Sequence, residues 1–485
     1  MENLKEKTAK AFLWQTTFQT LSQSFSWCIT ILLVRILEPG DYGLIGMAMI
    51  FMGLMDILVD LGLGAAIIQR KESRLTKEDL SSLFWVGILA GVGFYIIIYA
   101  VSPSVAAYFE EPRLSGIIRL SGVGFFIGCL RLIPYNLLTK TLQFRKRGMA
   151  EFLSWTLSSI FCLIAALSGL GVWSLVIAYA LKEAFLTIII YIYQPFKPQF
   201  IFACKSIKNM FNFGIKLTVS RFLWYLYSNA DYLIIGRILG KIPLGYYSVA
   251  FQLSSMPVTK INQLIREVSF PAYSQIQDNK QELGFYFIKN IELVALILFP
   301  ILLGLYAVSD DFYAIILGER WLNGVMLFRI LCISCLFKAV FSQHAPVLNA
   351  VGRPDINFKY NLVLAIIMPI SFVIMLKYGI LWVAVAWVTV YPILSLYIVY
   401  QTLKILSLDA MSYMRAFVVP TISCIIMVLV VGLLQRVVPA MSMFRLIAAC
   451  ATGLIVYALS IWLISDKTIS DLKDIVFLLR QRRAF

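Results

Sequence analysis

Charged residues are scarce in this sequence. Asp, Glu, Lys and Arg make up 14% of its 485 residues, whereas a soluble globular protein carries roughly 25%. Hydrophobic residues reach 60%, and the mean hydropathy of +0.83 is spread along the whole chain. This excludes a soluble domain with a single membrane anchor. Because a bilayer-spanning helix needs roughly 20 apolar residues, the length allows about twelve to fourteen spans and no sizeable domain outside the membrane.

Motifs of catalysis are also missing. We find no phosphate-binding loop, nucleophile triad or metal-ligand constellation, and the only histidine is His344. The eight cysteines lie almost entirely in apolar runs, where we expect them to pack as small hydrophobic residues. Cys332 and Cys335 form a CxxC motif without a second pair, so we predict neither a metal site nor a redox site there. We therefore expect a protein that is not an enzyme and holds no cofactor.

The N-terminus lacks the features of a cleavable signal peptide. The charged stretch 1–10 runs directly into an apolar segment longer than a signal core, with no A-x-A-like site. We expect this first helix to stay in the membrane.

Apolar runs divided by turn residues predict an all-α polytopic membrane protein of about fourteen transmembrane helices. The predicted spans are 11–34, 42–68, 80–102, 115–138, 151–169, 172–194, 213–236, 244–267, 285–308, 325–348, 360–376, 380–403, 414–434 and 443–464.

The distribution of Lys and Arg predicts the orientation. With the N-terminus inside, cations in the cytoplasmic loops outnumber those in the opposite loops by about three to one. Both termini are therefore expected in the cytoplasm. The same bias explains much of the net charge of +16 and excludes nucleic acid as a partner.

An internal repeat organises the chain. Arg35-Ile36-Leu37 recurs as Arg237-Ile238-Leu239, and an ordered series of identities, including Glu111 with Glu319 and Gly116 with Gly324, follows at an offset of about 208 residues. This offset spans six helices, so the repeats are parallel, and transporters commonly bind substrate between such repeats. The predicted parts are an N-terminal lobe at 1–196, a C-terminal lobe at 205–403, two accessory C-terminal helices at 404–465 and a basic cytoplasmic tail at 466–485. The tail is expected either to lie on anionic lipid as an amphipathic helix or to fray.

Cations within the predicted spans outnumber acids. Ionisable groups in a membrane cost several kcal/mol unless they are paired or face a wet cavity, so they mark functional sites. A net-positive cleft favours an anionic passenger, and guanidinium groups suit phosphate or carboxylate. The candidate substrate-binding cations are Arg119, Arg131, Arg221, Lys260, Arg266, Arg329 and Lys338.

Four intramembrane acids are candidates for coupling to a proton or a sodium ion: Asp56, Asp60, Asp231 and Glu292. Asp56 and Asp60 are the best placed, because residues four apart share one helix face and an isolated carboxylate in a low dielectric can carry a proton. Asp231 has a second interpretation, a structural pair with Arg221. His344, two residues before Pro346, is equally expected to titrate or to hydrogen-bond a freed carbonyl.

The first span carries a polar stripe. Gln15, Gln19 and Gln23 recur at a spacing that keeps them on one helix face. Such a stripe either joins helices or lines a water-filled cleft. Beside so many intramembrane charges, we favour the cleft.

Two blocks carry a resemblance to a known family. One runs from Leu33 through Arg35-Ile-Leu-Glu-Pro-Gly-Asp-Tyr-Gly43 to Ile67-Ile-Gln-Arg-Lys71, and the other is Ser269-Phe-Pro-Ala-Tyr-Ser-Gln-Ile-Gln-Asp278. The chain resembles the polysaccharide exporters of the multidrug/oligosaccharidyl-lipid/polysaccharide superfamily, of Wzx type, in the colanic acid and teichuronic acid branch. The resemblance covers most of the chain and weakens after about Gln401.

The resemblance implies a pair of six-helix lobes that flip an undecaprenyl-diphosphate-linked oligosaccharide by alternating access. It implies a monomeric flippase. The partners that it implies are membrane lipids, the polysaccharide polymerase and the export machinery. Related lipid II flippases grip the diphosphate with arginines in the first, second and eighth helices. The first helix here has glutamines instead, whereas Lys260 and Arg266 in the eighth span match that pattern in kind.

Two other functions are alternatives. A multidrug antiporter of the same superfamily would favour an acidic or apolar cleft. A membrane glycosyltransferase or polymerase that uses the lipid carrier would need a large outside loop with catalytic acids. The longest outside loop predicted here, Ser309–Gly324, is short, and its Asp310 and Asp311 are interpreted as solvated charges.

Overall fold

The computed structural model describes residues 25–60, 76–141, 143–201, 204–438 and 441–464. Over these ranges the regular secondary structure is helical, with no strand. The chain forms two compact units, 1–245 and 246–485, and each is described by itself.

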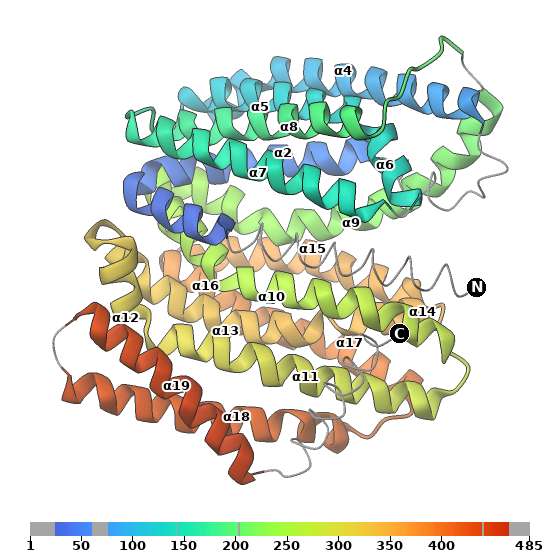
Figure 1. The fold of residues 1–485 in the computed structure, drawn as a ribbon. Coiled ribbons are helices and arrows are strands. Elements are labelled where there is room, and N and C mark those ends of the chain that lie inside the picture. The colour runs from blue at the N-terminus through green and yellow to red at the C-terminus, as the bar shows by residue number, and fades with distance from the viewer. Residues whose placement is uncertain (1–24, 61–75, 142, 202–203, 439–440, 465–485) are drawn as a thin grey trace. The chain divides into compact units, whose positions relative to one another are not determined.

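The first unit is a bundle of long helices (Figure 1). Its members are a helix at Phe25–Ile36, α2 (Pro39–Asp60), α4 (Lys77–Tyr108), α5 (Arg113–Leu130), α6 (Leu132–Lys140), α7 (Phe144–Leu167), α8 (Val172–Tyr193) and α9 (Cys204–Leu239). Helix α5 packs between α4 and α8, α7 packs on α8, and α2 packs along α9.

Local chemistry explains several helix ends. A capping box opens α4: the Asp79 N–H donates to Thr76 Oγ1 at 3.1 Å and the Thr76 N–H donates to Asp79 Oδ2 at 3.3 Å. Glycines with positive φ precede α8 and α16 (Ile380–Val388): Gly171 at 52° and Gly379 at 111°. These two glycines belong to the sequence repeat, so both copies turn into the helix in a conformation that glycine adopts without strain.

The start of α10 (Lys241–Gln275) makes an unusually close contact with the start of α2. A Cβ added to Gly43 would overlap the carbonyl oxygen of Lys241, and a Cβ added to Gly245 would overlap the carbonyl oxygen of Pro39. Ion pairs flank this crossing, with Lys241 Nζ 2.6 Å from Glu111 Oε1. The α9–α10 corner is thereby tied both to α2 and to the α4–α5 turn.

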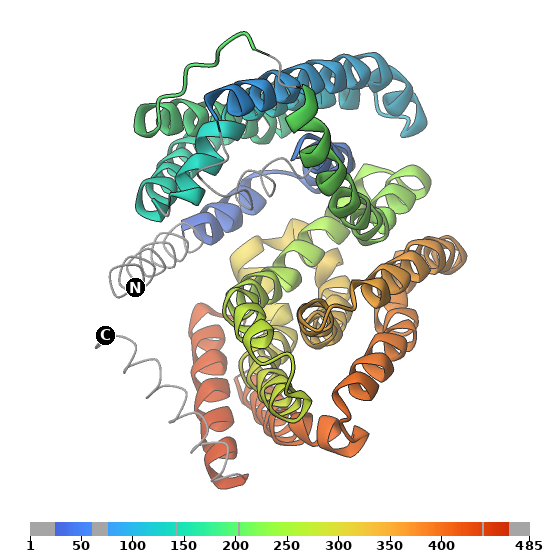
Figure 2. The ribbon, with the colours of Figure 1, turned by 90° about the vertical axis from the view of Figure 1, so that its right-hand side faces the viewer.

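The second unit contains most of α10 and the helices that follow it (Figure 2). These are α11 (Lys280–Ala307), α12 (Ser309–Asp311), the π-helix η2 (Phe312–Leu317), the 3-10 helix η3 (Glu319–Gly324), α13 (Val325–Phe341), α14 (His344–Ala350), α15 (Pro354–Leu376), α16, α17 (Val390–Leu406), α18 (Ala410–Val437) and α19 (Met443–Ile464). Helix α13 packs on α11 and α16, and α15 packs on α16 and α17.

The predicted all-α polytopic fold is confirmed. Ten helices or runs of consecutive helices in the described ranges are long and apolar enough to cross a membrane, and shorter apolar helices cover Phe25–Ile36 and Pro39–Met55. The remaining predicted spans, 213–236 and 244–267, fall within α9 and α10. The count of fourteen is compatible with these elements but is not itself confirmed.

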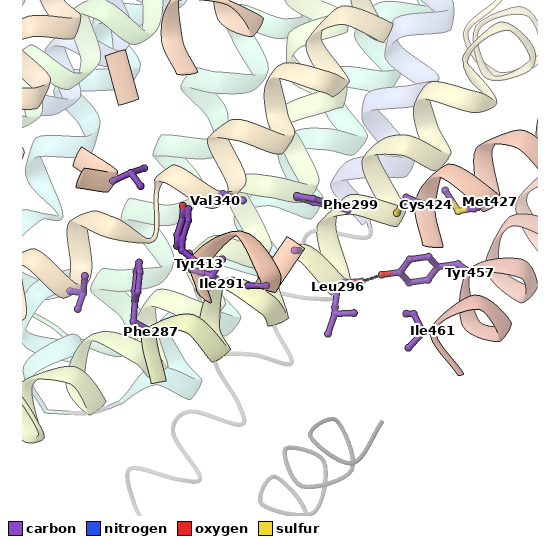
Figure 3. Close-up of a cluster of buried hydrophobic side chains, with 14 of the residues drawn as sticks. Phe287, Ile291, Leu296, Phe299, Val340, Tyr413, Cys424, Met427, Tyr457 and Ile461 are labelled. Carbon is purple, nitrogen blue, oxygen red and sulfur yellow. Dashed lines mark hydrogen bonds between the residues drawn. The ribbon is translucent and has the colours of Figure 1, made fainter. Parts of the chain in front are cut away.

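The accessory helices are built onto α11. Helix α18 packs along α11, and α19 packs on α18. Figure 3 shows the apolar cluster that joins them, in which Cys424 and Met427 of α18 lie near Tyr457 and Ile461 of α19. The Tyr457 hydroxyl donates to the Leu296 carbonyl of α11 at 2.8 Å.

The interpretation of Ser309–Gly324 as a solvated loop was wrong. The segment folds into α12, η2 and η3 and buries Trp321. Asp311 is fully buried and forms an ion pair with Arg445 of α19, with Arg445 Nε 3.0 Å from Asp311 Oδ2. An unpaired buried charge would be very costly, so Asp311 is a structural anchor for the accessory helices, whereas Asp310 stays half-exposed.

Candidate functional site

Several of the predicted site residues cannot be placed. Gln15, Gln19 and Gln23 lie outside the described residues. Asp56 and Asp60 lie in α2, and Arg221 lies in α9, but the structure describes only their backbone. Their proposed roles therefore stay predictions.

A cluster of three charges lies inside the first unit. Arg131, at the break between α5 and α6, forms an ion pair with Glu183 of α8, and Lys182 Nζ lies 2.7 Å from the same carboxylate. The Glu183 side chain is 7% exposed, and those of Arg131 and Lys182 are 19% and 23% exposed. Two cations thus share one buried carboxylate, and the cluster carries a net positive charge.

Aromatic rings flank this cluster. The Lys182 ammonium lies 5.4 Å from the centroid of the Trp155 ring and 5.7 Å from that of Tyr179. Aromatic faces attract cations, and they also offer stacking surfaces. The cluster combines a positive charge with flat apolar faces.

Arg119 is held in a different place in this unit. Its Nε–H donates to Ser102 Oγ of α4 at 2.9 Å, and its guanidinium lies over the Tyr99 ring, 4.1 Å from the centroid. Ser102 is 1% exposed, so this hydrogen bond fixes the position of the Arg119 Nε atom.

The second unit repeats the arrangement around Arg329 of α13. The Arg329 Nε–H donates to Ser309 Oγ at 2.7 Å, and the guanidinium lies 5.8 Å from the centroid of the Tyr306 ring. Tyr99-Ala-Val-Ser102 and Tyr306-Ala-Val-Ser309 are identical in sequence. We had predicted both arginines but not their shared partners, which this recurring tetrapeptide could have disclosed.

Lys338 of α13 lies between two aromatic rings. Its ammonium is 3.5 Å from the Trp387 centroid and 4.1 Å from the Phe251 centroid. The Trp387 indole N–H donates to the Tyr247 hydroxyl at 3.1 Å, which fixes the ring. The two rings stabilise the Lys338 ammonium within the helical bundle. Arg329, on the same helix, has different partners, Ser309 and Asp310.

A buried polar network joins α10, α11 and the α13–α14 junction. Gln343 Nε2 donates to Asn262 Oδ1 at 2.9 Å, and Asn290 Nδ2 donates to Gln343 Oε1 at 3.2 Å. The neighbouring His344 is fully buried, with Nε2 3.0 Å from the Tyr413 hydroxyl of α18. This contact of His344 is to a side chain rather than to the freed carbonyl that we considered.

The remaining candidates are dispersed. Glu292 pairs with Lys289 on its own helix at 3.1 Å. Lys260 is half-buried and Arg266 is exposed, both on α10. Asp231 is fully buried, and its Oδ1 accepts from the Tyr232 N–H at 2.9 Å; its predicted pair with Arg221 concerns a side chain that is not described.

Comparisons with known proteins found similar sequences and similar folds. The family model described as "Polysaccharide biosynthesis protein" matches residues 32–326. The chain is 31% identical to the teichuronic acid biosynthesis protein TuaB of Bacillus subtilis over 70% of each chain. It is 29% identical to the lipopolysaccharide biosynthesis protein WzxC of Escherichia coli over 74% of this chain and 73% of that one. The fold is similar to that of the lipid II flippase MurJ in its inward closed conformation, with a TM-score of 0.73, 15% identity, and coverage of 92% of this chain and 98% of that chain.

Proposed function

Since the chain belongs to the polysaccharide biosynthesis protein family, we propose that it is a flippase for a lipid-linked oligosaccharide. Its passenger would be an undecaprenyl-diphosphate-linked, anionic repeat unit of an exopolysaccharide or an O-antigen. The family match over residues 32–326 is the observation that carries the proposal.

The charge inside the first unit supports an anionic passenger. Arg131 and Lys182 share the single carboxylate of Glu183, and Arg119 has a serine and a tyrosine as its partners. Apolar surroundings strengthen the field of such charges. A diphosphate or an acidic sugar would compensate them.

The relatives support a glycan as the passenger. Their names refer to the biosynthesis of teichuronic acid and of lipopolysaccharide, and the solved structure is that of a lipid II flippase. Trp155 and Tyr179 next to Lys182 would stack on sugar rings. The chain's own residues would bind and release the passenger, and none would form or break its bonds.

The wider setting follows from the sequence. The protein would work as a monomer in the inner membrane of a bacterium, with both termini in the cytoplasm, and would hand its passenger to a polymerase and export machinery. Asp56 and Asp60 would couple movement to a proton or a sodium ion. Alternating access of the two predicted lobes, 1–196 and 205–403, would carry the passenger across.

The test follows the passenger in a strain that lacks this chain. Undecaprenyl-diphosphate-linked repeat units are expected to accumulate in the cytoplasmic leaflet, where an added membrane-impermeant glycan-modifying reagent cannot reach them. The native chain should restore labelling from outside, and Arg131→Gln should restore it poorly. Arg353→Gln, in an exposed pair with Asp355, is the matched control and should restore it fully. Full labelling without the chain, together with a loss of drug resistance, would favour a multidrug antiporter instead.

A further inference from the structure

An arginine held by a serine and a tyrosine occurs twice, once as Arg119 with Ser102 and Tyr99. The second copy is Arg329 with Ser309 and Tyr306, and the two copies differ in one respect. In the second unit, Asp310 follows the shared tetrapeptide, and its Oδ2 lies 2.5 Å from Arg329 Nη2. In the first unit the residue at this position is Pro103, which has no carboxylate. The same arginine geometry is therefore neutralised in one copy and not in the other.

The Arg119 guanidinium keeps its outer edge available. Its Nε is held by Ser102 and one face by the Tyr99 ring. Within the residues that the structure describes, no carboxylate pairs with Arg119, and its two terminal nitrogens make no hydrogen bond. In the second copy a terminal nitrogen is the atom that binds Asp310. Asp310 thus marks where an oxyanion would bind in the first copy.

The surroundings favour a phosphate as that oxyanion. Arg119 lies about 9 Å along α5 from its first residue, at a rise of about 1.5 Å per residue, so it is close to a helix end. Helix ends of a membrane protein lie near the level of lipid headgroups. Tyr99 and its neighbours Ile96 and Ile97 on α4 are exposed, which leaves an apolar surface for acyl or isoprenoid chains. A guanidinium with two free nitrogens binds phosphate in a bidentate manner.

We propose that Arg119, held by Ser102 and Tyr99, binds the phosphate group of a lipid, at a position that Asp310 fills in the second copy. The phosphate would belong either to an anionic phospholipid or to the diphosphate carrier lipid. The second source rests on the proposed function, whereas the first does not.

The experiment measures lipid binding to the purified full-length chain in a nonionic detergent. The probes are phosphatidylglycerol and undecaprenyl diphosphate, each compared with a lipid of the same chains that has no phosphate, diacylglycerol and undecaprenol. Arg119→Gln is expected to weaken binding of a phosphate lipid at least about tenfold, the loss typical of a charge-assisted contact. Arg353→Gln, in an exposed pair with Asp355, is the control, and it should leave binding unchanged.

Two further variants test the role of Asp310. Pro103→Asp would supply the missing carboxylate and is expected to weaken phosphate binding as Arg119→Gln does. Asp310→Asn would free Arg329 and is expected to add a second binding site. The melting temperature of each variant shows whether it folds. If Arg119→Gln does not fold, Pro103→Asp and Asp310→Asn still test the proposal.

The two sources give different results. Loss of phosphatidylglycerol binding identifies a phospholipid site, and loss of undecaprenyl diphosphate binding alone identifies a carrier site. Unchanged binding of both lipids in Arg119→Gln and Pro103→Asp, or an equal loss in Arg353→Gln, would overturn the proposal. Because binding is measured without transport, such a failure would leave the flippase test unaffected.

Discussion

Gly43 and Gly245 make the same contact from opposite sides. Gly43 packs against the backbone of Lys241, and Gly245 packs against the backbone of Pro39. Gly43 and Gly245 are separated by the same offset as Arg35 and Arg237 of the sequence repeat, and so are Pro39 and Lys241. The contact is therefore reciprocal between equivalent segments, and each glycine is needed because the other segment's backbone is too close for a side chain.

We predict that Gly43→Ala or Gly245→Ala destabilises the protein. A methyl group at either position would overlap a carbonyl oxygen, and backbone cannot move aside as a flexible side chain can. Overpacking of this kind costs about 1–3 kcal/mol. The measurement is the thermal unfolding of the purified protein in detergent. Gly93→Ala in α4 and Gly432→Ala in α18 have open space around the added methyl and should be neutral or slightly stabilising; equal losses in all four variants would contradict the prediction.

The buried pair of Asp311 and Arg445 should be required for stability. Removing one partner leaves an uncompensated buried charge, so Asp311→Asn or Arg445→Met is expected to cost about 3–5 kcal/mol. The double variant Asp311→Leu/Arg445→Met should be closer to the native protein than either single variant, because both charges are gone. Thermal unfolding and proteolysis between α18 and α19 would measure the loss.

The exposed pair of Arg353 and Asp355 provides the control for this prediction. Their side chains are 50% and 47% exposed, and solvent screens such pairs. Arg353→Gln should therefore leave the unfolding temperature nearly unchanged. A comparable loss in this control would mean that burial does not explain the effect at Asp311.

Glu183→Gln should be more damaging than Lys182→Gln. The first change leaves Arg131 and Lys182 facing each other without a carboxylate, whereas the second leaves the Arg131–Glu183 pair intact. For a buried pair the difference is expected to reach about 3 kcal/mol. The double variant Arg131→Gln/Glu183→Gln should recover part of it. Thermal unfolding of the native protein, Arg131→Gln, Glu183→Gln and this double variant completes the double-mutant cycle. Additive single effects would show that the three side chains do not act together.

The coupling hypothesis concerns Asp56 and Asp60. If one of these carboxylates carries the driving proton, transport by the native chain should depend on pH, and Asp56→Asn/Asp60→Asn should flatten that dependence. Asp355→Asn, an exposed acid outside this pair, should keep the native profile. The measurement is passenger flipping in proteoliposomes under an imposed pH gradient, and an unchanged profile in the double variant would refute proton coupling through this pair.

Helices were predictable because each span had to be apolar over most of its length. Hydropathy did not show where they break. The predicted span 115–138 is interrupted at Arg131, and the span 380–403 is interrupted at Thr389. The hydrophobic run continues through both breaks. A proline follows each break by three residues, Pro134 and Pro392, and it cannot donate a hydrogen bond to the carbonyl of the residue that ends the preceding helix. These prolines, rather than the hydropathy, were the signal that could have predicted the breaks.

The candidate site was predictable in its residue types but not in its pairings. Arg131 has no acid nearby on its own helix, and its partner Glu183 is 52 residues away. Asp311 was interpreted as solvated. Its partner Arg445 is 134 residues away, so the sequence did not indicate that the two charges would pair. Charge pairs between distant helices need the fold to be known first. The repeated Tyr-Ala-Val-Ser tetrapeptide is the exception, since it places the same local arrangement in both halves.

The residues that follow this tetrapeptide limit how the halves can be exchanged. Pro103-Ser104 in the first half becomes Asp310-Asp311 in the second. A chimaera made by joining two first halves to α18 and α19 would carry Ser104 at the position of Asp311, and Arg445 would lose the carboxylate with which it pairs. A single dipeptide therefore suits the second half, and not the first, to hold α18 and α19.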